Sequence, residues 1–223
     1  MKFDARVVGL PNQLANAKKH MPKQNYQFEV AKFKAAEARL IKKLPAQKKV
    51  ISELFRKKST CISHFRCERF TFLQPLRDFA CFLNGTTIEE VVEENAWTES
   101  LHIVLMGEND VLIVPFDFPM PLTVRIEGRN FPLIIGSAPR IQKELENLDE
   151  YVAVEETLGI KAFPAFVEMD RKAMAKFEKA EGVGRRFWAK WGVVALRGLV
   201  QRSLKSGVPL IVDSNYGELP VEA

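Results

Sequence analysis

Four short apolar runs decide the fold: LHIVLM (101–106), DVLIVPF (110–116), LTVRIEG (122–128) and FPLIIG (131–136). They are rich in the β-branched and aromatic residues that favour strands. The turn sequences GEND and GRN separate the first two runs and the last two, whereas the proline-rich link PFDFPMP joins the two pairs. This spacing predicts four strands in a mainly antiparallel sheet.

Helical patterns lie on both sides of these runs. Upstream, PLRDFACFL (75–83) followed by Asn84-Gly85 predicts a short helix with a glycine stop, and Thr87 with Glu90 forms a capping-box pattern. Downstream, helices are predicted over PRIQKELENL and over RRFWAKWGVVALRGLVQRSLKSG, with a strand in VPLIVD after them. Further predictions are strands in YVAV (151–154) and AFPAFVE (162–168), a helix capped by Asp170 over RKAMAKFEKA, and either a strand or a helical turn in TCISHFRCERFTF (60–72).

Together these elements predict an α+β core domain over residues 59–223, with helices packed on one face of a mainly antiparallel sheet. A basic helical arm over residues 1–58 precedes it. The link PFDFPMP (115–121) is apolar for a surface loop, and we expect it either to cross the core or to offer a groove or a ligand to a partner.

The arm contains two amphipathic helices that pair as a hairpin at residues 26–58. Pro45 separates them, because its ring cannot follow a helical residue without a clash. Residues 9–25 are expected to be a loop-rich lead-in, since they contain Gly9 and two prolines. The apolar positions expected to face inward are Phe33, Ala36, Leu40 and Leu44 in the first helix and Val50, Ile51, Leu54 and Phe55 in the second, whereas Lys32, Lys34, Lys42 and Lys43 are expected on the solvated face.

Charge is sorted along the chain. Residues 1–58 hold 15 Lys and Arg against 4 Asp and Glu, residues 59–170 hold 8 against 19, and residues 171–223 hold 10 against 5. The formal net charge of +5 therefore hides a basic arm, an acidic middle and a basic tail. Such sorting indicates a strong electrostatic surface that acts on a partner or on another part of the same chain.

The basic residues at the end of the arm are the predicted partner- or phosphate-binding site: Lys42, Lys43, Lys48, Lys49, Arg56, Lys57 and Lys58. The first hypothesis is a non-enzymatic binding or adaptor protein in which these residues engage an acidic protein partner or the acidic segment of a second copy. The alternative is sequence-nonspecific nucleic-acid binding through the same residues. A third hypothesis is an enzyme that uses a cysteine thiol or a carboxylate at a strand end.

Composition narrows the class of protein. With 47% hydrophobic and 27% charged residues the chain is typical of a globular protein rather than a disordered one. It has no apolar window of the roughly 20 residues that a membrane helix requires, and no signal-peptide pattern. Three cysteines in a chain of this size favour free thiols in a reducing compartment. We therefore expect a cytoplasmic protein without a cofactor.

The cysteines and one histidine are spaced as Cys61, His64, Cys67 and Cys81. If residues 60–72 were helical, the first three side chains would converge and could bind zinc. If the segment is a strand, His64 points away from both cysteines. The segment has neither a CxxC pair nor the glycine that zinc knuckles favour, so buried free thiols are the preferred interpretation, and no metal site is predicted.

Two aspartates directly follow apolar strands: Asp117 after VLIVPF and Asp213 after VPLIV. Open sheets often carry catalytic or metal-binding carboxylates in this position, but turn formation explains both residues equally well. The sequence EGVGRRFW places glycines ahead of a helix with two arginines, which suits either an anion site or a turn between helices.

The last third of the chain resembles the N-terminal domain of the SseB family, bacterial proteins associated with type III secretion and with general interaction roles. The resemblance is carried by PAFVEMDRKAMAKF, with Pro164, Phe166, Ala173 and Phe177, and by GVPLIVDSNYGELPV, with Gly207, residues 210–212, Asn215 and Leu219. Val167 departs from the small hydroxyl residue that the family carries after the aromatic residue. The resemblance implies an interaction role and no catalytic residues.

Overall fold

The protein is described by a computed structural model at residues 3–67, 73–94, 96–107, 110–127, 132–152 and 183–213. Within these residues the strands form one six-stranded sheet in the order β2-β1-β6-β3-β5-β4. The strand bounds are β1 (Phe3–Val7), β2 (Ser63–Cys67), β3 (Asp110–Val114), β4 (Leu122–Val124), β5 (Leu133–Ser137) and β6 (Leu210–Asp213).

Strand pairing confirms the predicted α+β class and the mainly antiparallel sheet. β1 pairs antiparallel with both β2 and β6, β6 pairs antiparallel with β3, and β4 pairs antiparallel with β5. β3 and β5 run parallel, with Val111 opposite Ile134. The first and last strands of the described chain therefore lie side by side in the middle of the sheet.

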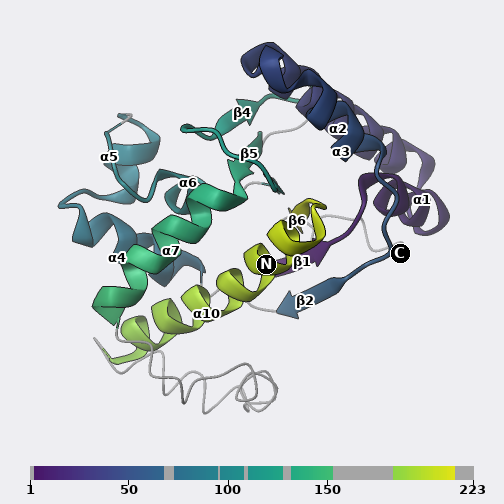
Figure 1. Ribbon diagram of the computed structural model, residues 1–223. Helices are drawn as coiled ribbons and strands as arrows, with labels where there is room; N and C mark the ends of the chain where they lie inside the picture. The colour runs from purple at the N-terminus through teal and green to yellow at the C-terminus, as the bar shows by residue number, and fades with distance from the viewer. Residues whose placement is uncertain are drawn as a thin grey trace.

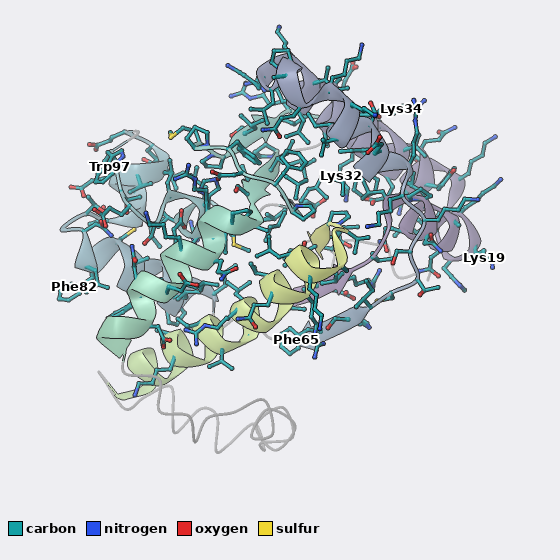
Figure 2. All side chains as sticks on the ribbon, in the orientation of Figure 1. Lys19, Lys32, Lys34, Phe65, Phe82 and Trp97 are labelled. Carbon is teal, nitrogen blue, oxygen red and sulfur yellow. The ribbon has the colours of Figure 1, made fainter. Side chains whose placement is uncertain are left out.

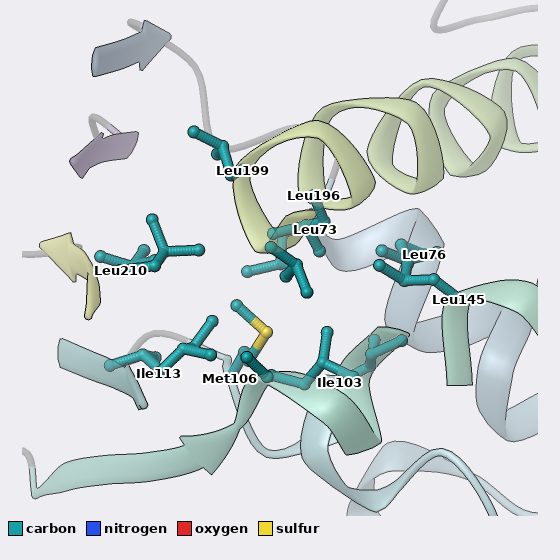
Figure 3. Close-up of a cluster of buried hydrophobic side chains, with 14 of the residues drawn as sticks. Leu73, Leu76, Ile103, Met106, Ile113, Leu145, Leu196, Leu199 and Leu210 are labelled. Atoms are coloured by element: carbon teal, nitrogen blue, oxygen red, sulfur yellow. The ribbon is translucent and has the colours of Figure 1, made fainter. Parts of the chain in front are cut away.

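One face of the sheet packs against the helices that follow the arm in sequence (Figure 1). Alternate strand residues, among them Val7, Ile113 and Leu210, point into this core. Figure 3 shows Ile113 and Leu210 facing Leu196 and Leu199 across the cluster. The helices here are α4 (Leu73–Leu83), α5 (Ile88–Val92), α6 (Leu101–Val104), α7 (Ala138–Val152) and α10 (Val183–Ser206).

The basic arm covers the opposite face of the sheet. It consists of α1 (Leu10–His20), α2 (Lys23–Lys43), a short 3-10 turn at Pro45–Gln47 and α3 (Lys48–Arg56). Phe33, Leu40 and Ile51 of the arm share a second core with the other set of alternate strand residues, such as Leu112 and Ile211. The arm is therefore the third layer of a helix–sheet–helix arrangement, with its outer surface exposed (Figure 1).

Several local predictions are confirmed. The two predicted arm helices correspond to α2 and α3, and the break between them begins at Pro45. Gly85 after α4 and Gly207 after α10 adopt positive φ values of 65° and 62°, which glycine adopts without strain. Both hydrogen bonds of the capping box between Thr87 and Glu90 are present.

Other local predictions are wrong. The lead-in at 9–25 is mostly the helix α1, because Pro11 occupies its first turn, where a missing N–H costs nothing, and Leu10, Gln13 and Ala17 are buried along one face. The run LHIVLM contains the helix α6 rather than a strand, since Ile103, Val104 and Met106 are all fully buried and a short apolar run has no diagnostic period.

The remaining sequence predictions fall partly within and partly outside the described residues. The segment with two open interpretations, 60–72, contains the strand β2. Tyr151 and Val152 of the predicted strand YVAV belong to α7. The strand AFPAFVE and the helix capped by Asp170 lie outside the described residues, as do most of the residues that carry the SseB resemblance. No helix in the described part of the chain is both long enough and apolar enough to span a membrane.

Gly9 is a position where the fold leaves no room for a side chain. A Cβ atom there would lie 2.5 Å from both the carbonyl oxygen of Lys57 and the amide nitrogen of Ser59. We expect Gly9→Ala to lower the free energy of unfolding by about 1–3 kcal/mol, because the backbone of residues 57–59 would have to shift away from the new methyl group. Urea unfolding measures this effect. Asn16→Ala, on the exposed side of α1, serves as the control and should leave stability unchanged or slightly higher.

Candidate binding surface on the basic arm

Lys32 of α2 fixes the arm to the sheet. Its side chain is buried, and its Nζ lies 2.7 Å from an oxygen of Glu29, 3.2 Å from Oδ2 of Asp110 and 3.4 Å from Oδ1 of Asp213. Glu29 precedes Lys32 by one helical turn, whereas the two aspartates come from the sheet. The ammonium group therefore bridges α2 to the strands β3 and β6.

Three aspartates lie next to one another across neighbouring strands of the sheet. Asp213 lies opposite Asp4 in the pairing of β6 with β1, and Val212 lies opposite Val111 in the pairing of β6 with β3, so Asp110 is next in line. Residues opposite each other share a face of the sheet. Asp4 accepts hydrogen bonds at 2.6 Å from Arg6 and at 3.0 Å from His64.

Burial and charge act against each other in this cluster. Burial by itself lowers the pKa of the Lys32 ammonium, but the surrounding carboxylates, Asp213 most strongly, outweigh it and raise that pKa above its usual range. Burial raises the pKa of the Asp213 carboxyl to about 7, and the nearby Lys32 opposes this increase without cancelling it. Glu29 and Asp110 act in the same direction as burial on Asp213.

All the basic residues predicted as the binding site lie at the protein surface. Each of the seven is exposed, and none forms an ion pair with a described residue. Lys57 has a structural role as well, because its Nζ donates hydrogen bonds of 2.8 Å and 3.2 Å to the carbonyl oxygens of Ser206 and Gly207 at the end of α10. The prediction that Lys32 is solvated is wrong, whereas Lys19 and Lys34 project outward from the arm (Figure 2).

An open groove of about 690 Å³ runs beside α3. Lys49, Arg56 and Lys57 supply cations along it, while Val50 and Phe116 supply apolar surface. Val50 is 51% exposed, so the prediction that it faces inward is wrong. The link PFDFPMP reaches the core through the buried Phe118, whereas Phe116 lines the groove; that the link serves a partner stays a prediction.

The end of the molecule around α4 and α5 exposes apolar and acidic side chains rather than basic ones. Phe82, Val92 and Trp97 are 75%, 47% and 69% exposed. Glu93 and Glu94, which directly follow α5, are exposed beside them in sequence. Figures 1 and 2 show this end on the far side of the molecule from the arm.

Within the part of the chain that the structure describes, which leaves out the side chain of Cys67, the cysteine and histidine pattern does not gather a metal site. His64 and Cys67 lie in the strand β2 and Cys61 precedes it, so the helical spacing required for the zinc hypothesis is absent. Cys61 is exposed, contrary to the expectation of a buried thiol, and its Sγ donates to the carbonyl of Ser63 at 3.3 Å. Cys81 is a buried free thiol, and burial raises its pKa. In the described residues no three His, Cys, Asp or Glu side chains are placed to hold a metal ion.

The two strand-end aspartates have different environments. Asp213 is part of the buried cluster around Lys32. Asp117 is exposed and accepts two hydrogen bonds, of 2.7 Å and 3.0 Å, from the guanidinium of Arg140. The structure does not describe the side chains of the sequence EGVGRRFW (181–188), so the hypothesis of an anion site there lies outside the described part of the chain.

Sequence reasoning missed the role of Lys32. The signal for it was present, because Lys32 lies directly before Phe33 and one turn from Ala36 and so belongs to the buried side of α2. A lysine on an apolar face, in a chain with aspartates at strand ends, indicates an internal ion pair.

Comparison of this chain with protein-family models, with curated proteins and with solved structures finds no match.

Removing the Lys32 ammonium should destabilise the protein strongly. We expect Lys32→Met to lower the free energy of unfolding by about 3–5 kcal/mol, because buried carboxylates lose their cation. Lys34→Met, two residues along on the exposed side of the same helix, is the matched control and should change stability by less than about 0.5 kcal/mol. Equal effects of the two variants, measured by urea unfolding, would contradict a fastening role for Lys32.

The raised pKa of Asp213 predicts that stability falls as pH rises. Between the ordinary aspartate pKa and about 7, the folded protein holds a proton that the unfolded chain has released. Unfolding free energies measured at pH values across this range should therefore decrease, by at most about 1.4 kcal/mol for each pH unit. Asp213→Asn should reduce this slope, and an unchanged slope in that variant would assign the proton to another group.

Proposed function

We propose that this chain is a non-enzymatic binding or assembly protein whose basic arm engages an acidic protein partner or a second copy of itself. The observation that supports this proposal is the groove beside α3, where the cations of Lys49, Arg56 and Lys57 outnumber the single carboxylate of Glu53 and the apolar side chain of Val50 is exposed. A groove that combines apolar surface with cations suits a segment whose apolar side chains are interleaved with carboxylates.

The arrangement of the arm supports binding at its outer surface. The inner side of α2 packs in the second hydrophobic core and carries the ion cluster of Lys32, so the position of α2 on the sheet is fixed. Lys42, Lys43, Lys48 and Lys49 are exposed around the turn between α2 and α3. Because the backbone of the arm is already fixed, binding a partner there requires little further ordering of the backbone.

The second copy is a suitable partner because the molecule carries complementary ends. At the end remote from the arm, Val92 is exposed directly before the exposed Glu93 and Glu94 in sequence, and the neighbouring helix α4 carries the exposed Phe82. A contact between the arm of one molecule and this end of the next would be heterologous, and such contacts extend into chains unless they close into a ring.

Charge reversal tests the proposal. Light scattering should show self-association of the unaltered protein at low salt and its loss at high salt, because exposed charge pairs are screened over about 10 Å at 0.1 M ionic strength. The pair Lys48→Glu and Lys49→Glu should abolish association at low salt. Adding Glu93→Lys and Glu94→Lys to the same chain should restore it, because the opposite charges are then exchanged.

The matched control is Lys18→Glu with Lys19→Glu, which changes the net charge equally at the far end of α1. Equal losses from both pairs would show that net charge rather than the groove drives association. A protein that stays monomeric but retains an acidic protein partner through Lys48 and Lys49 would assign the arm to that partner. Nucleic acid that co-purifies at low salt, detected by the ratio of absorbance at 260 and 280 nm, and is released by high salt would replace the proposal with phosphate binding.

A further inference from the structure

A second open groove, of about 660 Å³, lies between α2 and β4, the last strand in the sheet order. Figure 1 shows β4 beside α2. The polar and small residues that line this groove are Ala35, Ala38, Arg39 and Lys42 of α2, with Thr123 of β4 and Arg125 just after it. The four helix residues follow an i, i+3, i+4, i+7 spacing, so they lie on one face of α2.

The lining of this groove carries one sign of charge. Arg39, Lys42 and Arg125 are cations, and none of them forms an ion pair with a described residue. Lys42 and Arg125 are exposed, and Arg39 is half-buried. In the described part of the chain no carboxylate lines this groove, whereas Glu53 lines the groove beside α3. A groove lined by a single sign of charge concentrates ions of the opposite sign.

The groove between α2 and β4 offers little apolar surface to a protein partner. Val124, which also lines it, is already buried in the core, and its other uncharged residues are two alanines and Thr123. Thr123 is exposed, and a threonine hydroxyl can donate a hydrogen bond to an oxyanion. Among the described lining residues none is aromatic, so a nucleic-acid base has no ring to stack on. The groove therefore suits a ligand that is bound through its negative charges.

Adjacent phosphate groups match the types and the spacing of these donors. The guanidinium groups of Arg39 and Arg125 have the geometry that donates paired hydrogen bonds to phosphate. Arg39 and Lys42 are three residues apart, which separates them by only about 4.5 Å along the helix axis. An extended acidic peptide places carboxylates on one side only at every second residue, about 6.6 Å apart. Phosphates linked in a chain carry their charges more closely and need no apolar contact.

From this geometry we infer that the groove between α2 and β4 binds a linear phosphate chain. Arg39 and Lys42 hold the chain from the helix, and Arg125 and the Thr123 hydroxyl hold it from the strand. This site is separate from the groove beside α3, because the two grooves share no lining residue. The inference therefore goes beyond the proposed protein binding and does not depend on it.

Isothermal titration calorimetry on the full chain tests the inference with tripolyphosphate, orthophosphate, hexaglutamate and oligothymidylate. Tripolyphosphate should bind, and orthophosphate should bind at least about tenfold more weakly, because a single phosphate engages fewer of the cations. Failure of tripolyphosphate to bind at millimolar concentration would overturn the site, as would equal affinities for tripolyphosphate and orthophosphate. Hexaglutamate or oligothymidylate that binds more tightly than tripolyphosphate, through Arg125, would overturn it in favour of an acidic protein or a nucleic acid.

Arg125→Gln is the main variant, because Arg125 is exposed and lies outside β4, so the fold does not depend on it. It should weaken tripolyphosphate binding at least about tenfold through the loss of a charge-assisted contact. Arg39→Gln should have a similar effect, provided that circular dichroism shows the half-buried position still folded.

Lys23→Gln is the matched control, since Lys23 is exposed on the same helix about 24 Å along its axis from Arg39. This variant removes the same charge as Arg125→Gln but should leave tripolyphosphate affinity within about twofold. Equal losses from Lys23→Gln and Arg125→Gln would show that net charge alone drives binding and would overturn the inference.

Discussion

The burial of one lysine among carboxylates is the constraint on which the arrangement of this protein depends. Lys32 leaves water only because Glu29 on its own helix and two aspartates on neighbouring strands surround its ammonium group. An ion pair of this kind is weak evidence of added stability, since desolvation offsets most of its attraction. The ion cluster does specify the position of α2, because Lys32 reaches Asp110 and Asp213 only where the ends of β3 and β6 meet.

That fixed position explains how one arm can be both core and surface. The inner side of α2 and α3 gives Phe33, Leu40 and Ile51 to the second hydrophobic core. The outer side keeps its lysines and arginines in solvent, where they create a basic surface next to the groove of α3. The acidic residues of the middle segment are also divided between interior and surface. Asp110 is buried, whereas Glu93 and Glu94 are exposed at the end of the molecule remote from the arm.

Much of the fold could be predicted from local patterns, and the failures have physical causes. Alternating or continuous apolar runs identified β3, β4, β5 and β6, and Pro45 and Gly207 marked real helix boundaries. The helix α6 was missed because a short, largely buried apolar run has no diagnostic period. The exposed lysines of the candidate surface were evident from the sequence. The position of Lys32 on the buried side of α2 was a usable signal as well, but the partners of Lys32 were not evident, because residues 29, 110 and 213 come together only in the tertiary structure.

The central position of β1 and β6 also has a consequence for how the chain folds. Asp4 and Asp213 are opposite each other in the middle of the sheet, although 208 residues separate them in sequence. Contacts between such distant segments slow folding, because a long loop must close before they contribute stability. During synthesis, β1 and β3 therefore each have an unpaired edge until β6 is made and pairs with both. Such edges can pair with other chains, so the nascent protein is open to aggregation and to chaperone binding in that interval.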